Sequence, residues 1–314
     1  MNPRRLAAAL LLALLAPAAA QAAEAFVTLQ QANAVAVINP ATGALLATIP
    51  VPGHPAGIAM SRDLTRAYVT SPDLPGVSEI DTVGRRVLRT LTLPGGPLGI
   101  AAAPDGGALY VADWYGSDVM VIDTRAFTLQ RRITAGQSPS GLAVTPDSQM
   151  LVVAARLDDA LVLVRAGEDK PAATIKVGAH PFGVTIDPAG TRAYAADVES
   201  DDVAVIDLAA RRLVTRIKVG RRPYVVALAG NIGFVTNELA GTVTPFDLKT
   251  FTPLAAIRVG DNPEGIQASA DGIHLYVANW MDDSMSVIDA GARQVTRSFP
   301  VGDSPRAFGT FLRP

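Results

Sequence analysis

The two tryptophans of the chain occupy the same position of a repeated pattern. Trp114 lies in VADWYGSDVMVID, where Tyr115 follows it, and Trp280 lies in VANWMDDSMSVID. Aromatic residues make up only 5% of the chain, so two tryptophans in short polar turns are a selective placement. A large ring with a hydrogen-bonding group is typical of recognition sites. We expect these turns to form part of a binding surface; the alternative is that each indole covers a loop of the neighbouring repeat.

Charged and imidazole side chains recur next to a repeated proline. His54 and His180 each precede this proline, and so does Arg222. Two histidines invite a metal or acid–base site, but these two belong to repeats three units apart. That separation is too wide for one metal ion, whose nitrogen ligands lie at about 2 Å, so we expect each histidine to hydrogen bond at the surface. The predicted ligand-binding or partner-binding residues are Trp114, Trp280, Tyr115, Tyr224, His54, His180, Arg156, Arg222, Glu264 and Arg306.

The sequence carries no familiar catalytic arrangement. It contains no cysteine, which excludes thiolate zinc sites, cysteine nucleophiles and covalently attached haem. It also has no nucleophile elbow and no phosphate-binding loop. Asp113, Asp197, Asn237 and Asn279 share one phase and look like metal ligands, but we expect them to bond turn backbone. We therefore predict no catalytic residue, no metal and no cofactor.

Residues 1–22 have the features of a secretory signal peptide. Arg4 and Arg5 precede a stretch rich in Ala and Leu, and Ala20-Gln21-Ala22 offers a cleavage site. We therefore expect a periplasmic or secreted protein without a membrane span after cleavage, folded as one domain over residues 23–314. The chain has 27 Lys and Arg against 29 Asp and Glu, and cleavage would remove two of the arginines. This net acidic balance argues against nucleic acid as a partner.

Three landmarks recur in phase along the chain, which indicates a repeat architecture. They are a proline, an apolar or aromatic residue that opens a β-like run, and a polar residue that ends one. Each recurs seven times at a spacing of 42 residues, with a single spacing of 40. The positions are Pro55, Pro97, Pro139, Pro181, Pro223, Pro263 and Pro305; Phe26, Tyr68, Tyr110, Val152, Tyr194, Phe234 and Tyr276; and Asn39, Asp81, Asp123, Arg165, Asp207, Asp247 and Asp289.

Each unit contains four short runs rich in β-branched residues, such as GLAVTP, MLVVAA, ALVLVR and AATIKV. Turn signals such as Pro104-Asp105-Gly106 separate them. This pattern predicts an all-β fold, a seven-bladed β-propeller of four-stranded antiparallel blades. The chain starts at the second strand of a unit, Phe26, and ends with a lone first strand at 305–312. We therefore expect one C-terminal strand to close the ring by joining three N-terminal strands, which removes an open sheet edge.

The motifs YVTS, YVAD, FVTN and YVAN, followed by VID and IKVG, resemble the YVTN-type β-propeller repeat. The chain is similar in this respect to the YncE-like family of exported seven-bladed propellers. One unit departs from the pattern, with LVVAARLDDALVLVR where Tyr, Asn and Asp are expected. The resemblance implies that the first strand of each blade lines a central channel. It also implies that the blade links and the turns between second and third strands share one face, which carries most of the candidate residues.

Three functions remain open from the sequence. The first is a monomeric, non-catalytic propeller that binds a periplasmic partner protein or a small polar ligand on this face. The second is an enzyme or a redox-enzyme accessory subunit; a lactonase of the metal type would draw on Glu199, Glu264, Asn237 and Asn279. The third is single-stranded nucleic-acid binding by aromatic stacking beside arginines. We favour the first, because propellers host many activities and no catalytic motif is present.

Overall fold

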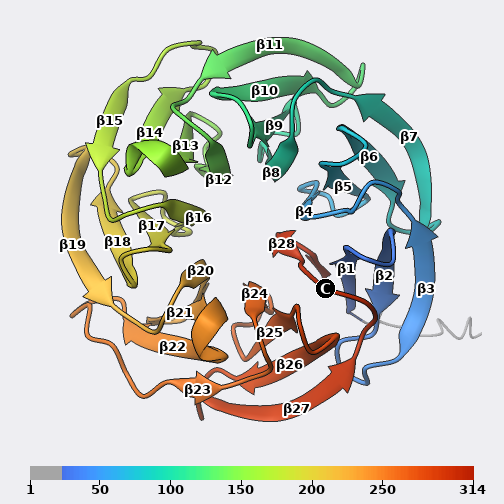
Figure 1. Ribbon diagram of the computed structural model, residues 1–314, viewed down its shortest axis with the longest axis vertical. Helices are drawn as coiled ribbons and strands as arrows, with labels where there is room; N and C mark the ends of the chain where they lie inside the picture. Colours follow the sequence, from blue (N-terminus) through green and yellow to red (C-terminus); the bar gives the residue numbers. More distant parts are fainter. Residues whose placement is uncertain (1–22) are drawn as a thin grey trace, which may run out of the picture.

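The computed structural model describes residues 23–314, in which seven antiparallel sheets surround a central axis (Figure 1). Each sheet is a blade whose first strand lies nearest the axis and whose fourth strand forms the outer wall. The prediction of a seven-bladed β-propeller with four-stranded blades is confirmed. The expected signal peptide at residues 1–22 lies outside the described residues. No helix within residues 23–314 has the length and apolar character needed to cross a membrane.

The strands follow the predicted repeat closely. The first strands are β4 Gly57–Met60, β8 Pro97–Ala102, β12 Pro139–Val144, β16 Pro181–Ile186, β20 Pro223–Ala229 and β24 Pro263–Ala268. The second strands are β1 Glu24–Leu29, β5 Arg66–Ser71, β9 Ala108–Asp113, β13 Met150–Ala155, β17 Arg192–Asp197, β21 Ile232–Asn237 and β25 His274–Asn279.

The outer half of each blade completes the sheets. The third strands are β2 Ala34–Ile38, β6 Gly76–Asp81, β10 Asp118–Asp123, β14 Ala160–Arg165, β18 Asp202–Asp207, β22 Thr242–Asp247 and β26 Ser284–Asp289. The fourth strands are β3 Leu45–Pro50, β7 Arg86–Thr92, β11 Thr128–Thr134, β15 Ala173–Lys176, β19 Arg212–Lys218, β23 Ile257–Arg258 and β27 Gln294–Pro300. Two single turns of 3-10 helix, η1 Arg156–Asp158 and η2 Glu238–Ala240, join second to third strands.

The burial of each strand explains its pattern of apolar and polar residues. The middle strands of a blade pack against a neighbouring blade on both faces, so β9 and β10 are buried along most of their length. The fourth strands alternate between exposed and partly buried residues, as in β19, because one face meets solvent. The recurring aromatic residue lies within the buried part of the second strand: Phe26, Tyr194 and Phe234 are among the largest fully buried side chains.

The C-terminal segment closes the ring, as the sequence predicts. β29 Leu312–Arg313 pairs antiparallel with β1, and Arg313 lies opposite Glu24. The Phe26 backbone N–H donates to the Phe311 carbonyl oxygen at 2.8 Å. One blade is therefore built from β1, β2 and β3 of the N-terminal region and β29 of the C-terminal region.

The closing strand is not the single run expected over 305–312. Its middle part, β28 Phe308–Gly309, leaves the sheet of β1 and pairs in parallel with β4 of the next blade. Gly309 permits this approach, because its φ is +130° and a Cβ there would lie 2.0 Å from the Ile58 carbonyl oxygen. The chain end therefore links two blades rather than completing one.

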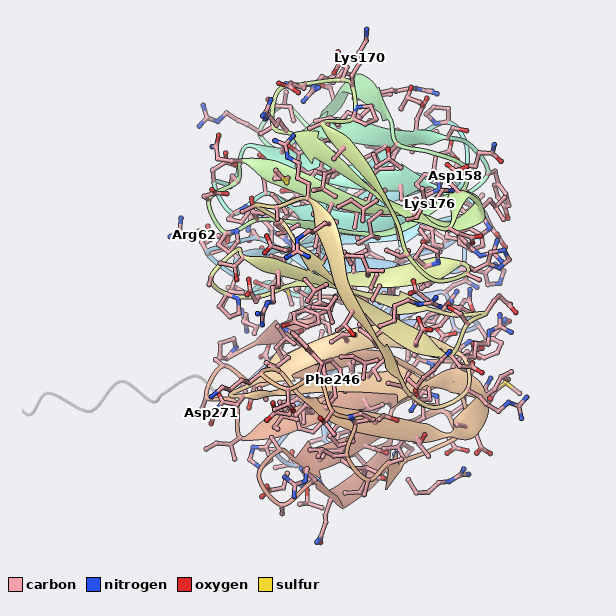
Figure 2. All side chains as sticks on the ribbon, turned by 90° about the vertical axis from the view of Figure 1, so that its left-hand side faces the viewer. Arg62, Asp158, Lys170, Lys176, Phe246 and Asp271 are labelled. Atoms are coloured by element: carbon pink, nitrogen blue, oxygen red, sulfur yellow. The ribbon has the colours of Figure 1, made fainter. Side chains whose placement is uncertain are left out.

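The propeller has two distinct faces, seen edge-on in Figure 2. One carries the blade links and the turns between second and third strands, including Asp158 and Lys176; we call it the link face. The other carries the turns between first and second strands, including Arg62 and Asp271; we call it the hairpin face. The candidate residues from the sequence belong to loops and strand starts on the link-face side.

Candidate functional site

The link face displays large apolar side chains from five of its seven turns between second and third strands. The exposed fractions are 60% for Leu74, 76% for Tyr115, 51% for Leu157, 50% for Leu239 and 61% for Met281. We call this set the link-face ring. Among the described turns between first and second strands on the hairpin face, Ile273 is the large apolar residue that is exposed. Val83, in a turn between third and fourth strands at that end of the blades, and Leu45, at the start of β3, are exposed as well. The link face differs in that an exposed apolar side chain recurs in five of its seven equivalent turns.

Local backbone structure produces part of this exposure. Leu157 and Leu239 are the middle residues of η1 and η2, which contain no buried residue. Each 3-10 turn ends in a left-handed residue, Asp159 with φ 50° and Gly241 with φ 60°. A left-handed residue reverses the chain into the third strand, and the middle side chain of the turn is left pointing to solvent.

Three predicted site residues come together next to this ring. Trp114, Tyr115 and Arg156 line a hollow of about 510 Å³ on the link face, together with Leu157. The Arg156 guanidinium lies 5.0 Å from the centroid of the Trp114 ring, which is a cation–π contact. The other edge of Trp114 meets Phe182 with the centroids 5.8 Å apart. Trp114 thus contacts the next blade, as the alternative reading expected, and remains half-exposed.

Trp280 lies elsewhere on the link face and takes no part in this hollow. It is half-buried, and its backbone N–H donates to the Asn262 carbonyl oxygen at 3.0 Å. The indole nitrogen is enclosed and has no hydrogen-bond partner within residues 23–314. The structure therefore does not bring the two tryptophans together.

The residue before each recurring proline has a backbone role. His54, His180 and Arg222 have φ values of 56°, 53° and 57°, in the left-handed region. Their backbone N–H groups are held by side chains of the preceding turn; Asp159, for example, accepts from His180 at 2.9 Å. The His54 Nδ1 lies 2.6 Å from an Asp73 carboxylate oxygen, and the Arg222 Nε lies 2.8 Å from a Glu238 carboxylate oxygen. These side chains form surface pairs within the link face.

Tyr224 and Glu264 are buried below the rim, inside the channel, and Arg306 is mostly buried beside them. They directly follow three of the recurring prolines, and in the first strands this position points toward the axis. The Arg306 Nε donates to Glu264 at 2.6 Å, and its Nη2 donates to the Tyr224 hydroxyl at 2.7 Å. Burial raises the pKa of Glu264, and the Arg306 charge offsets part of this rise. Burial likewise raises the pKa of the Tyr224 phenol.

Aromatic rings complete this arrangement. Phe182 packs on Tyr224 and on Phe308, with ring centroids 4.1 Å and 4.9 Å apart. We call Phe182, Tyr224, Phe308, Glu264 and Arg306 the channel plug. The plug fills the channel on the link-face side with apolar rings around one buried ion pair. Sequence periodicity places these residues in the repeat, but it does not reveal that their side chains meet across the axis.

The four short polar residues in one phase behave as structural groups. Asp113 accepts from the Gly96 backbone N–H at 2.8 Å, and Asp197 accepts from the Gly178 N–H at 2.9 Å, as expected. Asn237 and Asn279 differ, because their amides donate to hydroxyls of the third strand instead of bonding turn backbone. Within residues 23–314, no three histidine or carboxylate side chains form a group able to hold a metal ion.

A second site, which the sequence analysis did not single out, lies in the channel beyond the plug. It is a cavity of about 720 Å³ lined by the later halves of the first strands, including Met60, Ile100, Leu142 and Val184. Its lining reaches prolines of the turns on the hairpin face, such as Pro146. The signal that could have found it is the run of small and β-branched residues after each recurring Pro-x-Gly.

Comparisons with known proteins support the same architecture. The chain is a seven-bladed β-propeller, and a family described as "Lactonase, 7-bladed beta-propeller" matches residues 166–310. No curated protein shows significant sequence similarity to it.

Solved structures with the same fold are distant in sequence. Kuenenia stuttgartiensis hydrazine synthase is 21% identical with a TM-score of 0.74, covering 82% of this chain and 89% of that one. A functionally unknown protein from Desulfotomaculum acetoxidans DSM 771 is 13% identical with a TM-score of 0.76, covering 90% and 99%. Dihydro-haem d1 dehydrogenase NirN in complex with DHE is 17% identical with a TM-score of 0.69; the match covers 88% of this chain and 63% of NirN. At these identities the likeness shows the fold alone.

Proposed function

We propose that this propeller is a binding protein, active in the periplasm or outside the cell, whose link face docks a partner protein. The observation that carries the proposal is the link-face ring, in which Leu74, Tyr115, Leu157, Leu239 and Met281 are all at least half exposed. Isolated apolar residues are common on protein surfaces, but a set concentrated on one face favours an interaction surface.

The hollow beside Leu157 has the composition of an interface hot spot. Tyr, Trp and Arg are the residue types that contribute most to protein–protein affinity, and Tyr115, Trp114 and Arg156 lie together there. Charges of both signs surround them, such as Asp158 and Lys176 on the same side of the molecule. A polar rim of mixed sign around apolar contacts suits a protein partner better than a polyanion.

The other predicted link-face residues have supporting roles in this proposal. His54, His180, Arg222 and Trp280 occupy other loops of the link face, and Tyr224, Glu264 and Arg306 support that face from beneath. The YVTN-type motifs lead us to propose membership of the YncE-like family as well. No role in this interaction requires a metal or a cofactor.

A redox-enzyme accessory subunit is the second candidate. It is favoured by the likeness to hydrazine synthase and to the dihydro-haem d1 dehydrogenase NirN. In that case the partner that docks on the link face would be a cofactor-bearing dehydrogenase. The lactonase alternative has less support, because Glu264 is paired with Arg306 and the amide nitrogens of Asn237 and Asn279 donate to neighbouring hydroxyls.

The first test compares two faces of one protein. The mature wild-type protein, a Tyr115→Ser, Leu157→Ser variant and an Ile273→Ser control are immobilised and exposed to native periplasmic extract. All three changes replace an exposed apolar side chain by serine, so the fold is expected to survive in each. We expect one protein to be captured by the wild type and by the Ile273 variant but not by the double variant.

The captured protein is then purified and its affinity measured. Loss of two hot-spot side chains is expected to weaken binding by about 10- to 1,000-fold, or ~1.4–4 kcal/mol. Capture at equal strength by the double variant and the wild type would overturn the proposal. So would the absence of any partner that distinguishes the two faces.

A further inference from the structure

The channel cavity opens on the face opposite to the proposed docking surface. Figure 1 shows the first strands β4, β8, β12, β16, β20 and β24, with β28, encircling the axis. The cavity occupies about 720 Å³ between their later halves, within the 300–1,000 Å³ that small-molecule sites commonly have.

Close strand packing and the channel plug bound the cavity on the link-face side. The first strands approach one another where each Pro-x-Gly motif ends: a Cβ on Gly141 would lie 2.3 Å from the Phe182 carbonyl oxygen, and one on Gly183 would lie 2.4 Å from that of Tyr224. Phe182, Tyr224 and Phe308 fill the axis at this level. The cavity is therefore a cup whose mouth lies on the hairpin face.

The wall of the cup is largely apolar, and three of its polar side chains already hydrogen bond the surrounding strands. The Thr185 hydroxyl donates to the Val226 carbonyl oxygen at 2.6 Å. The Thr310 hydroxyl accepts from the Met60 N–H at 2.9 Å, and the Gln267 side-chain oxygen accepts from the Phe311 N–H at 2.6 Å. A ligand rich in polar groups would lose its hydration here without gaining partners, which costs free energy. An apolar ligand meets no such penalty.

The charges at the mouth select against anions. Asp63, Asp105, Asp147, Asp187 and Asp271 lie in the turns around it. Hydrogen bonds within the turns lower the pKa of Asp63, Asp147 and Asp271, so these carboxylates are ionised at neutral pH. Five carboxylates at the entrance give a negative potential that repels an anionic ligand.

Arginines of this end of the molecule, such as Arg85, Arg125 and Arg211, lie mainly in the turns between third and fourth strands, farther from the axis. Arg62 is the cationic residue that lines the cavity, and it is exposed. The arginines that start two nearby second strands are engaged farther out, Arg66 with Glu79 and Arg192 over the Phe251 ring. His274 lies against Tyr276.

From the size, the largely apolar wall and the carboxylates at the mouth, we propose that the channel cavity binds an uncharged, largely apolar small molecule. This site is separate from the link face. It does not depend on the proposed partner interaction, since the channel plug lies between the two.

The test uses two dyes that differ by one charged group. N-phenyl-1-naphthylamine is neutral, and 1-anilinonaphthalene-8-sulfonate is the same skeleton with a sulfonate; both fluoresce more strongly in apolar surroundings. We expect the neutral dye to bind the wild-type protein at one site per chain. The sulfonate should bind at least about tenfold more weakly, because the carboxylates at the mouth repel it.

Two kinds of variant locate the site. Ala143→Phe fills the cavity wall and should weaken binding of the neutral dye by about tenfold or more, whereas Ala292→Phe on an exposed turn should not. Since the natural chain has no cysteine, Ala143→Cys gives a single thiol with little change in volume. Bound neutral dye should slow its alkylation by iodoacetamide, and should leave a thiol at Ala292→Cys unaffected.

The Tyr115→Ser, Leu157→Ser variant should bind the neutral dye as the wild type does, because its changes lie on the other face. Absence of saturable binding of the neutral dye to the wild type would overturn the proposal. Binding of both dyes with equal affinity would do the same, and so would alkylation of Ala143→Cys that the dye does not slow. The cysteine experiment remains decisive if the phenylalanine variant does not fold.

Discussion

Asp197 is a buried carboxyl at a repeat position where two other blades have asparagine. Burial, together with a hydrogen bond to Asp202, raises its pKa to about 8. Arg216 and Lys218 pair with Asp202 at 2.6 Å and 3.1 Å, so their charges face Asp202 and not Asp197. Protonated Asp197 can therefore donate a hydrogen bond at neutral pH, as the amide of Asn237 does in its blade.

This assignment predicts a pH-dependent stability. The pKa of Asp197 is about 8 in the folded chain against an ordinary value of 3.8, so the folded state holds an extra proton between these limits. The free energy of unfolding should therefore fall as pH rises from about 4 to about 8, by up to ~1.4 kcal/mol per pH unit from this group. Asp197→Asn removes that slope, so the variant should be more stable than wild type at pH 8 and should lose its advantage near pH 4. Urea unfolding across this range measures the difference.

Asp147 provides a matched control, because its contribution to stability changes with pH in the opposite direction. Hydrogen bonds from Thr145 and from the Gln149 N–H lower the pKa of Asp147, so it stabilises the fold above its ordinary pKa and this stabilisation is lost on acidification. Asp147→Asn should thus cost stability at neutral pH and approach the wild type at low pH. If Asp197→Asn and Asp147→Asn changed stability with pH in the same direction, the assignment of a protonated Asp197 would be wrong.

For single residues, the sequence repeat predicted the place of a residue in a strand or turn better than it predicted which side chains contact that residue. The repeat placed Trp114 and Arg156 in equivalent turns of adjacent blades, and they meet in the structure. It placed Tyr224, Glu264 and Arg306 next to recurring prolines, but not in contact, because their encounter depends on how seven strands converge on the axis. The phase of the repeat can be read directly from the sequence, whereas contacts across the channel form only when the seven blades close into a ring.

The strand elements depend on glycine where the first strands converge. A Cβ on Gly99 would lie 1.9 Å from the Ser140 carbonyl oxygen of the next blade, so β8 and β12 would have to separate. We expect Gly99→Ala to lower the free energy of unfolding by about 1–3 kcal/mol, as overpacking in a well-packed core does. Gly107→Ala, in the turn that follows β8, meets nothing closer than 3.4 Å and should change stability by less than about 0.5 kcal/mol. Urea unfolding of both variants compares the two positions, and equal stabilities would contradict the close approach.

The sequence predicted the order and length of these strands, because the runs of β-branched residues and the turn residues recur in phase with the repeat. The unit that departs from the motif, around LVVAARLDDALVLVR, still forms β13 and β14, since its near-continuous runs of Ala, Leu and Val suit strands buried on both faces. The break in the closing strand did not follow. Parallel pairing of β28 with β4 joins residues about 250 positions apart, and no local pattern encodes such a contact.

For the whole molecule, closure determines whether seven blades form one cooperative unit. The last ten residues supply β28 and β29, the buried pair between Arg313 and Glu24 at 2.6 Å, and the Arg306 partner of Glu264. Removing them would expose the edge of β1 and leave two buried carboxylates without their arginine partners.

Deletion of residues 305–314 should therefore abolish stable folding. The combined loss of edge pairing and of two buried ion-pair partners is expected to exceed about 5 kcal/mol, which is comparable to the whole stability of many domains. Thermal unfolding followed by circular dichroism should lose its cooperative transition, and the truncated chain should aggregate through the open edge. A synthetic peptide of residues 305–314 should restore part of the transition, because it can pair with β1 as the native segment does. A truncated protein that melts at the temperature of the full chain, or one that the peptide leaves unchanged, would show that the ring does not depend on this closure.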